Sequence, residues 1–183
     1  MARLLRATGA TVAVAESATG GLVSSRLTDV SGASDFVSLN VVTYSERQKV
    51  SVLGVRPETI AAHTVTSAEV ALEMTHGLKK LMGSTGAGAG SGAGADTGAE
   101  AGDEPKGGHF LLALTGIAGP GGGTEQHPVG TIFISIAPPS GDAQVFHIVE
   151  PQGLTREELK REFSERALEL LRMALCKVPA PRL

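Results

Sequence analysis

TVAVAESATGG, residues 11–21, is the stretch that decides the fold. Its first five residues are small, apolar or β-branched, and they predict a short buried strand from Thr11 to Ala15. Two glycines follow, and we expect a helix from Gly20 to about Val30. A buried strand that passes through a glycine turn into a helix is typical of α/β proteins, in which ligands bind at the carboxyl ends of strands.

Strand and helix patterns continue to alternate along the rest of the chain. The remaining predicted strands span residues 36–44, 109–115, 130–137 and 144–149. The remaining predicted helices span residues 45–53 and 57–63 or begin at Ser67 and Thr155. This alternation predicts a layered α/β fold with a partly parallel sheet. Because the last strands follow one another without a helix between them, we expect the sheet to be mixed.

One segment, residues 83–108, lacks the composition of a folded element. It holds ten of the 24 glycines of the chain and no Val, Ile, Leu, Met or aromatic residue. Such a stretch cannot bury enough apolar surface to offset its backbone entropy, so we interpret it as a flexible insertion. It would serve as a linker if the chain formed two domains. Each flank, however, ends in an amphipathic helix that has no partner within that flank, which favours one domain over residues 1–183.

The composition of the chain argues against several classes of function. Its 183 residues carry 16 Lys and Arg against 19 Asp and Glu, and a net charge of −3 argues against binding of nucleic acid. The single cysteine, Cys176, excludes an intramolecular disulfide and a Cys-rich zinc site. The five histidines lack the spacing of metal ligands, so no metal is expected. Since we find neither a signal peptide nor a membrane span, we expect a soluble cytoplasmic protein.

The first candidate site follows the strand at residues 11–15. Ser17 lies at the strand end, and Thr19, Gly20 and Gly21 follow it at the start of a helix. Unpaired N–H groups at a helix start can hold an anion or an acyl oxyanion, and a serine beside them can act as a nucleophile. The alternative is that Ser17 or Thr19 only caps the helix.

The second candidate site follows the strand at residues 36–44. Lys49 can serve as a general base for a serine if burial keeps its amine neutral, and the hydroxyl of Tyr44 can position or relay the proton. Tyr44 is the only tyrosine of the chain. The alternative is a solvated lysine beside an exposed tyrosine.

The third candidate site is the glycine-rich loop LTGIAGPGGG, residues 114–123. It contains Thr115, Gly116 and Gly119, and runs of glycine N–H groups form concave anion sites. The loop lacks the lysine of a Walker A motif and the spacing of a dinucleotide fingerprint, so a glycine-rich turn without a ligand is the alternative. Arg156, at the start of the last helix, is suited to bind a phosphate group. The alternative is that Arg156 and Arg161 face the solvent and form ion pairs with Glu158 or Glu165.

Together these segments resemble the C-terminal domain of the CinA family. The resemblance rests on AESATGGLVSSRLTDV, VVTYSERQKV, LGVRPETIAAH and LTGIAGPGGGTEQHPVGTI, and it covers nearly the whole chain outside residues 83–108. Stand-alone members of the family are nicotinamide-nucleotide amidases (PncC type). The resemblance implies a three-layer α/β/α domain that hydrolyses the carboxamide of nicotinamide mononucleotide to nicotinate mononucleotide and ammonia. It implies no metal or other cofactor, and it suggests a homodimer or larger assembly.

The resemblance also assigns roles to residues. It makes Ser17 the nucleophile, Lys49 the base with Tyr44 beside it, residues 115–120 the nucleotide loop, and Arg156 a phosphate ligand. We expect the N–H groups of residues 19–21 to stabilise the oxyanion.

Departures from the family pattern keep two alternatives open. Ala18 replaces the cysteine of many members, Glu46 replaces Asn or Asp, and Asn40 and Thr64 replace usual glycines. The alternatives are a non-catalytic nucleotide-binding or regulatory module and an amidase for a different carboxamide.

Overall fold

The computed structural model describes residues 1–85 and 105–177. The elements follow the chain in the order α1 (Ala2–Thr8), β1 (Thr11–Glu16), α2 (Leu22–Thr28), η1 (Ala33–Asp35), β2 (Val37–Val42), α3 (Glu46–Leu53), α4 (Pro57–His63), α5 (Ala68–Thr85), β3 (His109–Gly116), β4 (Thr131–Ala137), β5 (Gln144–Val149) and α6 (Arg156–Lys177). Every strand predicted from the sequence is present, within two residues at each end.

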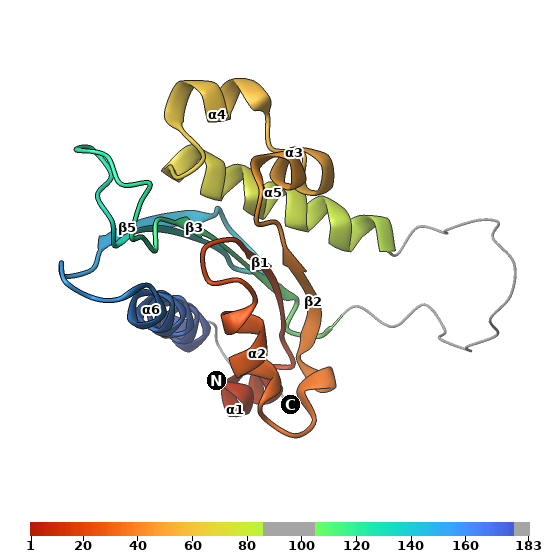
Figure 1. The fold of residues 1–183 in the computed structure, drawn as a ribbon. Coiled ribbons are helices and arrows are strands. Elements are labelled where there is room, and N and C mark those ends of the chain that lie inside the picture. Colours follow the sequence, from red (N-terminus) through yellow and green to blue (C-terminus); the bar gives the residue numbers. More distant parts are fainter. Residues whose placement is uncertain (86–104, 178–183) are drawn as a thin grey trace, which may run out of the picture.

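The strands form one five-stranded sheet in the order β2-β1-β3-β4-β5. β1 pairs in parallel with β2 and β3, whereas β4 pairs antiparallel with β3 and β5. The sheet is therefore mixed and partly parallel, as predicted. Because β1, β2 and β3 point the same way, their carboxyl ends meet at one edge of the sheet (Figure 1).

Helices cover both faces of the sheet and complete a three-layer α/β/α arrangement (Figure 1). On one face α1, α2 and α6 pack against the strands, with Leu5, Val23 and Phe163 fully buried. On the other face α3, α4 and α5 form the layer, and Leu53 and Met74 are buried there. β1 lies between the two layers in the interior of the sheet, which explains why its sequence is apolar without alternation.

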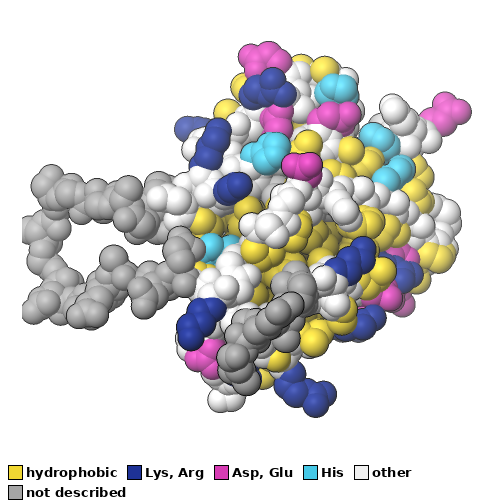
Figure 2. Space-filling view, turned by 180° about the vertical axis from the view of Figure 1, so that it is seen from behind, with side chains coloured by type: hydrophobic (Ala, Val, Ile, Leu, Met, Phe, Trp, Pro, Cys, Tyr) yellow, Lys and Arg dark blue, Asp and Glu magenta, His cyan; other side chains and the backbone are white. Residues whose placement is uncertain are grey.

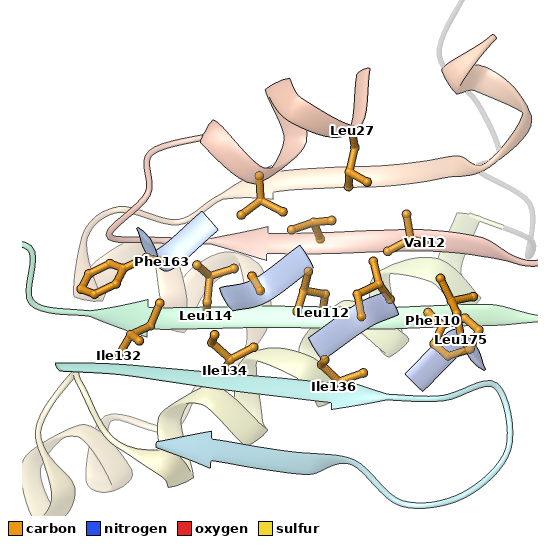
Figure 3. Packing of buried hydrophobic residues seen from close by; sticks show 14 of the residues in the cluster. Val12, Leu27, Phe110, Leu112, Leu114, Ile132, Ile134, Ile136, Phe163 and Leu175 are labelled. Carbon is orange, nitrogen blue, oxygen red and sulfur yellow. The ribbon is translucent and has the colours of Figure 1, made fainter. Parts of the chain in front are cut away.

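The larger core lies between α6 and the middle strands (Figure 3). Phe110, Leu112 and Leu114 project from β3 toward this core, and Ile132 and Ile134 project beside them from β4. All five are fully buried. Each such side chain stabilises the fold by about 1.5–3 kcal/mol relative to an exposed one, which anchors the strands that carry the candidate site.

Two features differ from the sequence-based expectations. α1 was not expected, and it is held by Leu5, which is fully buried, and by Arg6, which bonds to Asp35 and lies over the ring of Phe36. Both ends of the predicted insertion belong to ordered elements, because α5 continues through Thr85 and residues 105–108 form a turn that is hydrogen-bonded to Gly9, the residue after α1. The rest of that segment, residues 86–104, lies outside the described residues.

The surface is mixed in character. Figure 2 shows hydrophobic side chains gathered across the middle of one face, with charged side chains of both signs around them. Among the described residues, no helix is both long and apolar enough to cross a membrane.

Candidate active site

A cavity of about 560 Å³ opens at the edge of the sheet where β1, β2 and β3 end. Its lining comes from the ends of all three strands: Ser17 and Ala18, residues 44–46 with Lys49, and residues 115–119 with Gly121 and Gly122. Residues 64–66, Thr124, His127 and Arg156 complete it. Seven of the ten predicted site residues therefore lie around one cavity: Ser17, Tyr44, Lys49, Thr115, Gly116, Gly119 and Arg156.

Ser17 and Lys49 are in direct contact. The Nζ of Lys49 lies 2.7 Å from the Oγ of Ser17 and donates a second hydrogen bond of 3.0 Å to the carbonyl of Thr43. Ser17 is 6% exposed and Lys49 is 1% exposed. A capping box between Ser45 and Gln48 fixes the start of α3, so Lys49 enters the cavity from the first turn of a well-defined helix.

Burial tunes the amine of Lys49. Removal from water lowers its pKa from 10.5 to about 8, and the carboxylate of Glu46 on the same helix opposes this change. Near pH 8 a large fraction of the amine is therefore neutral. A neutral amine can accept the hydrogen bond of the Ser17 hydroxyl and then its proton, which is the requirement for a nucleophile–base pair.

The prediction that residues 19–21 supply oxyanion donors is wrong for Gly20 and Gly21, whose N–H groups are already bonded within the protein, and Thr19 does not line the cavity. The N–H of Gly21 and the hydroxyl of Thr19 donate to the carboxylate of Glu16, and the N–H of Gly20 donates to the carbonyl of Ser17. None of these three residues lines the cavity. The alternative, that Ser17 or Thr19 caps the helix, is also wrong, because Glu16 takes the N–H groups at the start of α2.

Other N–H groups are free to face a ligand. Among the described residues, no acceptor pairs with the N–H of Ala18, Gly119, Gly121 or Gly122, and all four residues line the cavity. Ala18 directly follows Ser17, so its N–H lies beside the nucleophile. These groups can stabilise negative charge on a bound molecule.

The glycine-rich loop is held in place by contacts that need its small residues. Gly119 has φ +67°, and a Cβ there would lie 2.6 Å from a methyl group of Val129. The hydroxyl of Thr115 donates to the carbonyl of Val65 at 3.0 Å, which ties the loop to the segment between α4 and α5. The loop is therefore a fixed wall of the cavity.

Tyr44 and Arg156 form the exposed rim. Arg156 donates one hydrogen bond to the carbonyl of Gly119 at 2.6 Å and another to the hydroxyl of Tyr44. The hydroxyl of Tyr44 thus bonds to Arg156, and no hydrogen bond joins it to Ser17 or Lys49, so a proton relay through Tyr44 is not supported.

Arg161 lies away from the cavity, whereas His127 belongs to its lining. Arg161 pairs with Glu157 rather than with Glu158 or Glu165, and it lies outside the cavity. His127 lies beside the glycine-rich loop and lines the cavity. Its ring packs edge-on against Phe133. Within the described residues, no group of three or more His, Cys, Asp or Glu side chains is placed to hold a metal ion.

Sequence reasoning missed one segment of the cavity lining, residues 64–66, and the buried acidic residue that precedes Ser17. Glu16 was treated only as part of a motif, although an acidic residue at the end of a buried strand is a signal in itself. The segment 64–66 also lines the cavity. Its Thr64 has φ +68°, a conformation that favours glycine, and the replacement of a usual family glycine at this position was the available signal.

Comparison with known proteins identifies the family of this three-layer domain. The model of the CinA C-terminal domain matches residues 1–110 and 99–175. A CinA-like protein from Desulfosudis oleivorans is 42% identical over 173 residues, which cover 94% of this chain and 36% of that protein. A CinA-like protein from Chlorobium chlorochromatii is 42% identical over 165 residues, covering 90% of this chain and 33% of that protein. The chain spans about a third of the length of these curated relatives.

Solved structures agree with this match. The competence/damage-inducible protein CihA from Agrobacterium tumefaciens superposes with a TM-score of 0.74 at 30% identity, covering 93% of this chain and 90% of that one. The competence damage-inducible protein A (ComA) from Klebsiella pneumoniae gives a TM-score of 0.77 at 28% identity, covering 97% and 94%. The chain belongs to the CinA C-terminal domain family.

Proposed function

We propose that this chain is an amidohydrolase that converts nicotinamide mononucleotide to nicotinate mononucleotide and ammonia. The observation that carries the proposal is the 2.7 Å contact between the Ser17 hydroxyl and the Lys49 amine inside a ligand-sized cavity. Family membership supports the choice of a pyridine nucleotide carboxamide as the substrate.

The mechanism uses Lys49 first as a base and then as an acid. Neutral Lys49 takes the proton of Ser17 while the Ser17 oxygen attacks the amide carbon. The resulting oxyanion accepts a hydrogen bond from the N–H of Ala18, and one well-placed donor of this kind is worth about 3 kcal/mol. The ammonium form of Lys49 returns the proton to the departing nitrogen, and ammonia leaves.

Hydrolysis of the acyl-enzyme repeats the same proton transfers with water. Lys49 takes a proton from the attacking water, and the Ser17 oxygen recovers a proton when nicotinate mononucleotide departs. Arg156 and the N–H groups of the glycine-rich loop supply positive charge for the 5′-phosphate of the nucleotide. Arg156 is already held beside the glycine-rich loop, because its guanidinium donates a hydrogen bond to the carbonyl of Gly119.

The test is ammonia release by the purified protein from nicotinamide mononucleotide. We expect turnover in the wild type and none in Ser17→Ala, whose fold is checked by circular dichroism. Unchanged turnover in Ser17→Ala rules out the proposed mechanism. A panel of other carboxamides separates the amidase with a different substrate from the non-catalytic module, which binds nucleotide and releases no ammonia from any of them.

A further inference from the structure

Glu16 is a fully buried acidic residue that the proposed reaction does not use. Its two carboxylate oxygens accept five hydrogen bonds. Oε2 accepts from the hydroxyl of Thr19 at 2.6 Å and from the N–H groups of Gly21 and Val23 at 3.0 and 3.1 Å. Oε1 accepts from both the N–H and the hydroxyl of Ser24.

Each of these five hydrogen bonds is donated to the carboxylate by an N–H group or a hydroxyl. Among the described residues no lysine or arginine forms an ion pair with Glu16, so the N–H groups and hydroxyls at the start of α2 balance its charge. A carboxamide of the same shape would turn its own N–H groups toward these donors. The site therefore requires a carboxylate, and Gln cannot replace it without loss of hydrogen bonds.

The position of Glu16 connects this cluster to both members of the nucleophile–base pair. Ser17 is its direct neighbour in the chain, and the turn that carries Ser17 is tied at Thr19 and Gly21 to the Glu16 carboxylate. The main-chain carbonyl of Glu16 accepts the N–H of Thr43 at 2.9 Å, and the carbonyl of Thr43 in turn accepts the Lys49 amine.

We infer that Glu16 is a positioning residue, which holds the Ser17 hydroxyl at proton-transfer distance from Lys49; this inference rests on the proposed function. The carboxylate does not touch the cavity. It acts by fixing the turn from Ser17 to Gly21, whose two glycines at φ +64° and +96° have no side chains to hold it. A displacement of about 1 Å at such a nucleophile costs about 10²-fold in rate.

The experiment measures the reactivity of Ser17 directly, without need of a known substrate. Phenylmethylsulfonyl fluoride is the probe: the Ser17 oxygen bonds to sulfur, fluoride leaves, and Lys49 takes the proton. Peptide mass mapping locates the label, and the rate is measured for the wild type, Ser17→Ala, Glu16→Gln and Glu150→Gln. Glu150 is the matched control, since its carboxylate is also buried and hydrogen-bonded, by Arg166, but it does not line the cavity.

We expect Glu16→Gln to lower the rate of Ser17 labelling about 10²-fold and to lower kcat for the amide with little change in KM. Glu150→Gln is expected to keep the wild-type rate. A merely structural role for Glu16 predicts lower thermal stability and wild-type labelling in the folded protein, and that result overturns the inference while leaving the proposed function intact. An equal loss in Glu150→Gln also overturns it, because the effect would then be general.

If Glu16→Gln does not fold, the Thr19→Val variant tests the positioning role of Glu16 instead. It keeps the shape of the side chain and removes one hydrogen bond to Glu16, and we expect labelling about tenfold slower. A wild-type rate in folded Thr19→Val overturns the inference. Absence of label on Ser17 in the wild type overturns the inference, because Ser17 is then not held in a reactive position, and ammonia release from nicotinamide mononucleotide decides the proposed function separately.

Discussion

Replacement of Lys49 by Met should stabilise the fold while it abolishes turnover. Met fills a similar volume and carries no charge, so it removes the cost of burying the amine. The same change removes the base, and ammonia release should fall to background. The hydrogen bond from Nζ to the carbonyl of Thr43 is lost in the variant, and this loss offsets part of the gain.

The size of the effect follows from the pKa of Lys49. Burial lowers it from 10.5 to about 8, so the unfolded chain binds the proton more tightly than the folded one. The free energy of unfolding of the wild type therefore rises with pH between about 8 and 10.5, as Lys49 loses its proton in the folded state first. At pH 7 the charged amine costs the fold about 3 kcal/mol.

Urea unfolding of the wild type and Lys49→Met at several pH values is the assay. All other titrating groups are shared, so they cancel in the difference between the two proteins. Between pH 7 and pH 10 the free energy of unfolding of the wild type should rise by about 2–3 kcal/mol relative to that of the variant. A difference that does not change with pH would show that Lys49 has an ordinary pKa in the folded protein, and it would refute the argument that burial prepares the base.

Three further predictions concern turnover and binding. The kcat/KM of the wild type should rise with pH to a plateau with a midpoint near the Lys49 pKa of about 8, and a profile flat from pH 6 to 10 contradicts a lysine base. Arg156→Ala should raise KM about tenfold with a smaller change in kcat, measured by steady-state ammonia release, because it removes one charge-assisted contact at the rim; an unchanged KM places the phosphate elsewhere. Gly119→Ala should raise KM by at least as much as Arg156→Ala, because the added Cβ would lie 2.6 Å from Val129. The control is Gly121→Ala, which should have a weaker effect on KM because nothing lies within 4 Å of a Cβ there. Equal KM values for the two glycine variants would show that the loop tolerates displacement.

Local sequence was sufficient for the strands, whereas the roles of Ser17 and Lys49 came from the family resemblance, because the residues alone fitted a helix cap and a solvated lysine equally. The apolar run at residues 11–15 has no polar face, so it could only be an interior strand. Ser17 and Lys49 follow neighbouring strand ends, and parallel strands bring such ends together. Their contact could be expected once the two strands were assumed to be adjacent.

Contacts between distant parts of the chain explain what the sequence did not predict. α1 has only seven residues, and its stability comes from burial of Leu5 and from the bond between Arg6 and Asp35. Neither contact is visible in a local pattern. The role of Glu16 depends on the angle between β1 and α2, because this angle directs the Glu16 carboxylate toward the first residues of α2. The secondary-structure propensities of single residues do not determine that angle.

The two ends of β3 serve separate purposes. Its carboxyl end at Thr115 and Gly116 forms a wall of the cavity, whereas its amino end at His109 follows the turn at residues 105–108. At that amino end Gly107 donates to the carbonyl of Gly9, and a Cβ at Gly107 would lie 2.3 Å from the carbonyl of Thr8, so the returning chain is fastened before the strand begins. The chain is therefore fixed at Gly107 and Gly108, a full strand's length from the cavity at the other end of β3, so a change at the amino end of this strand should leave the wall formed by Thr115 and Gly116 in place.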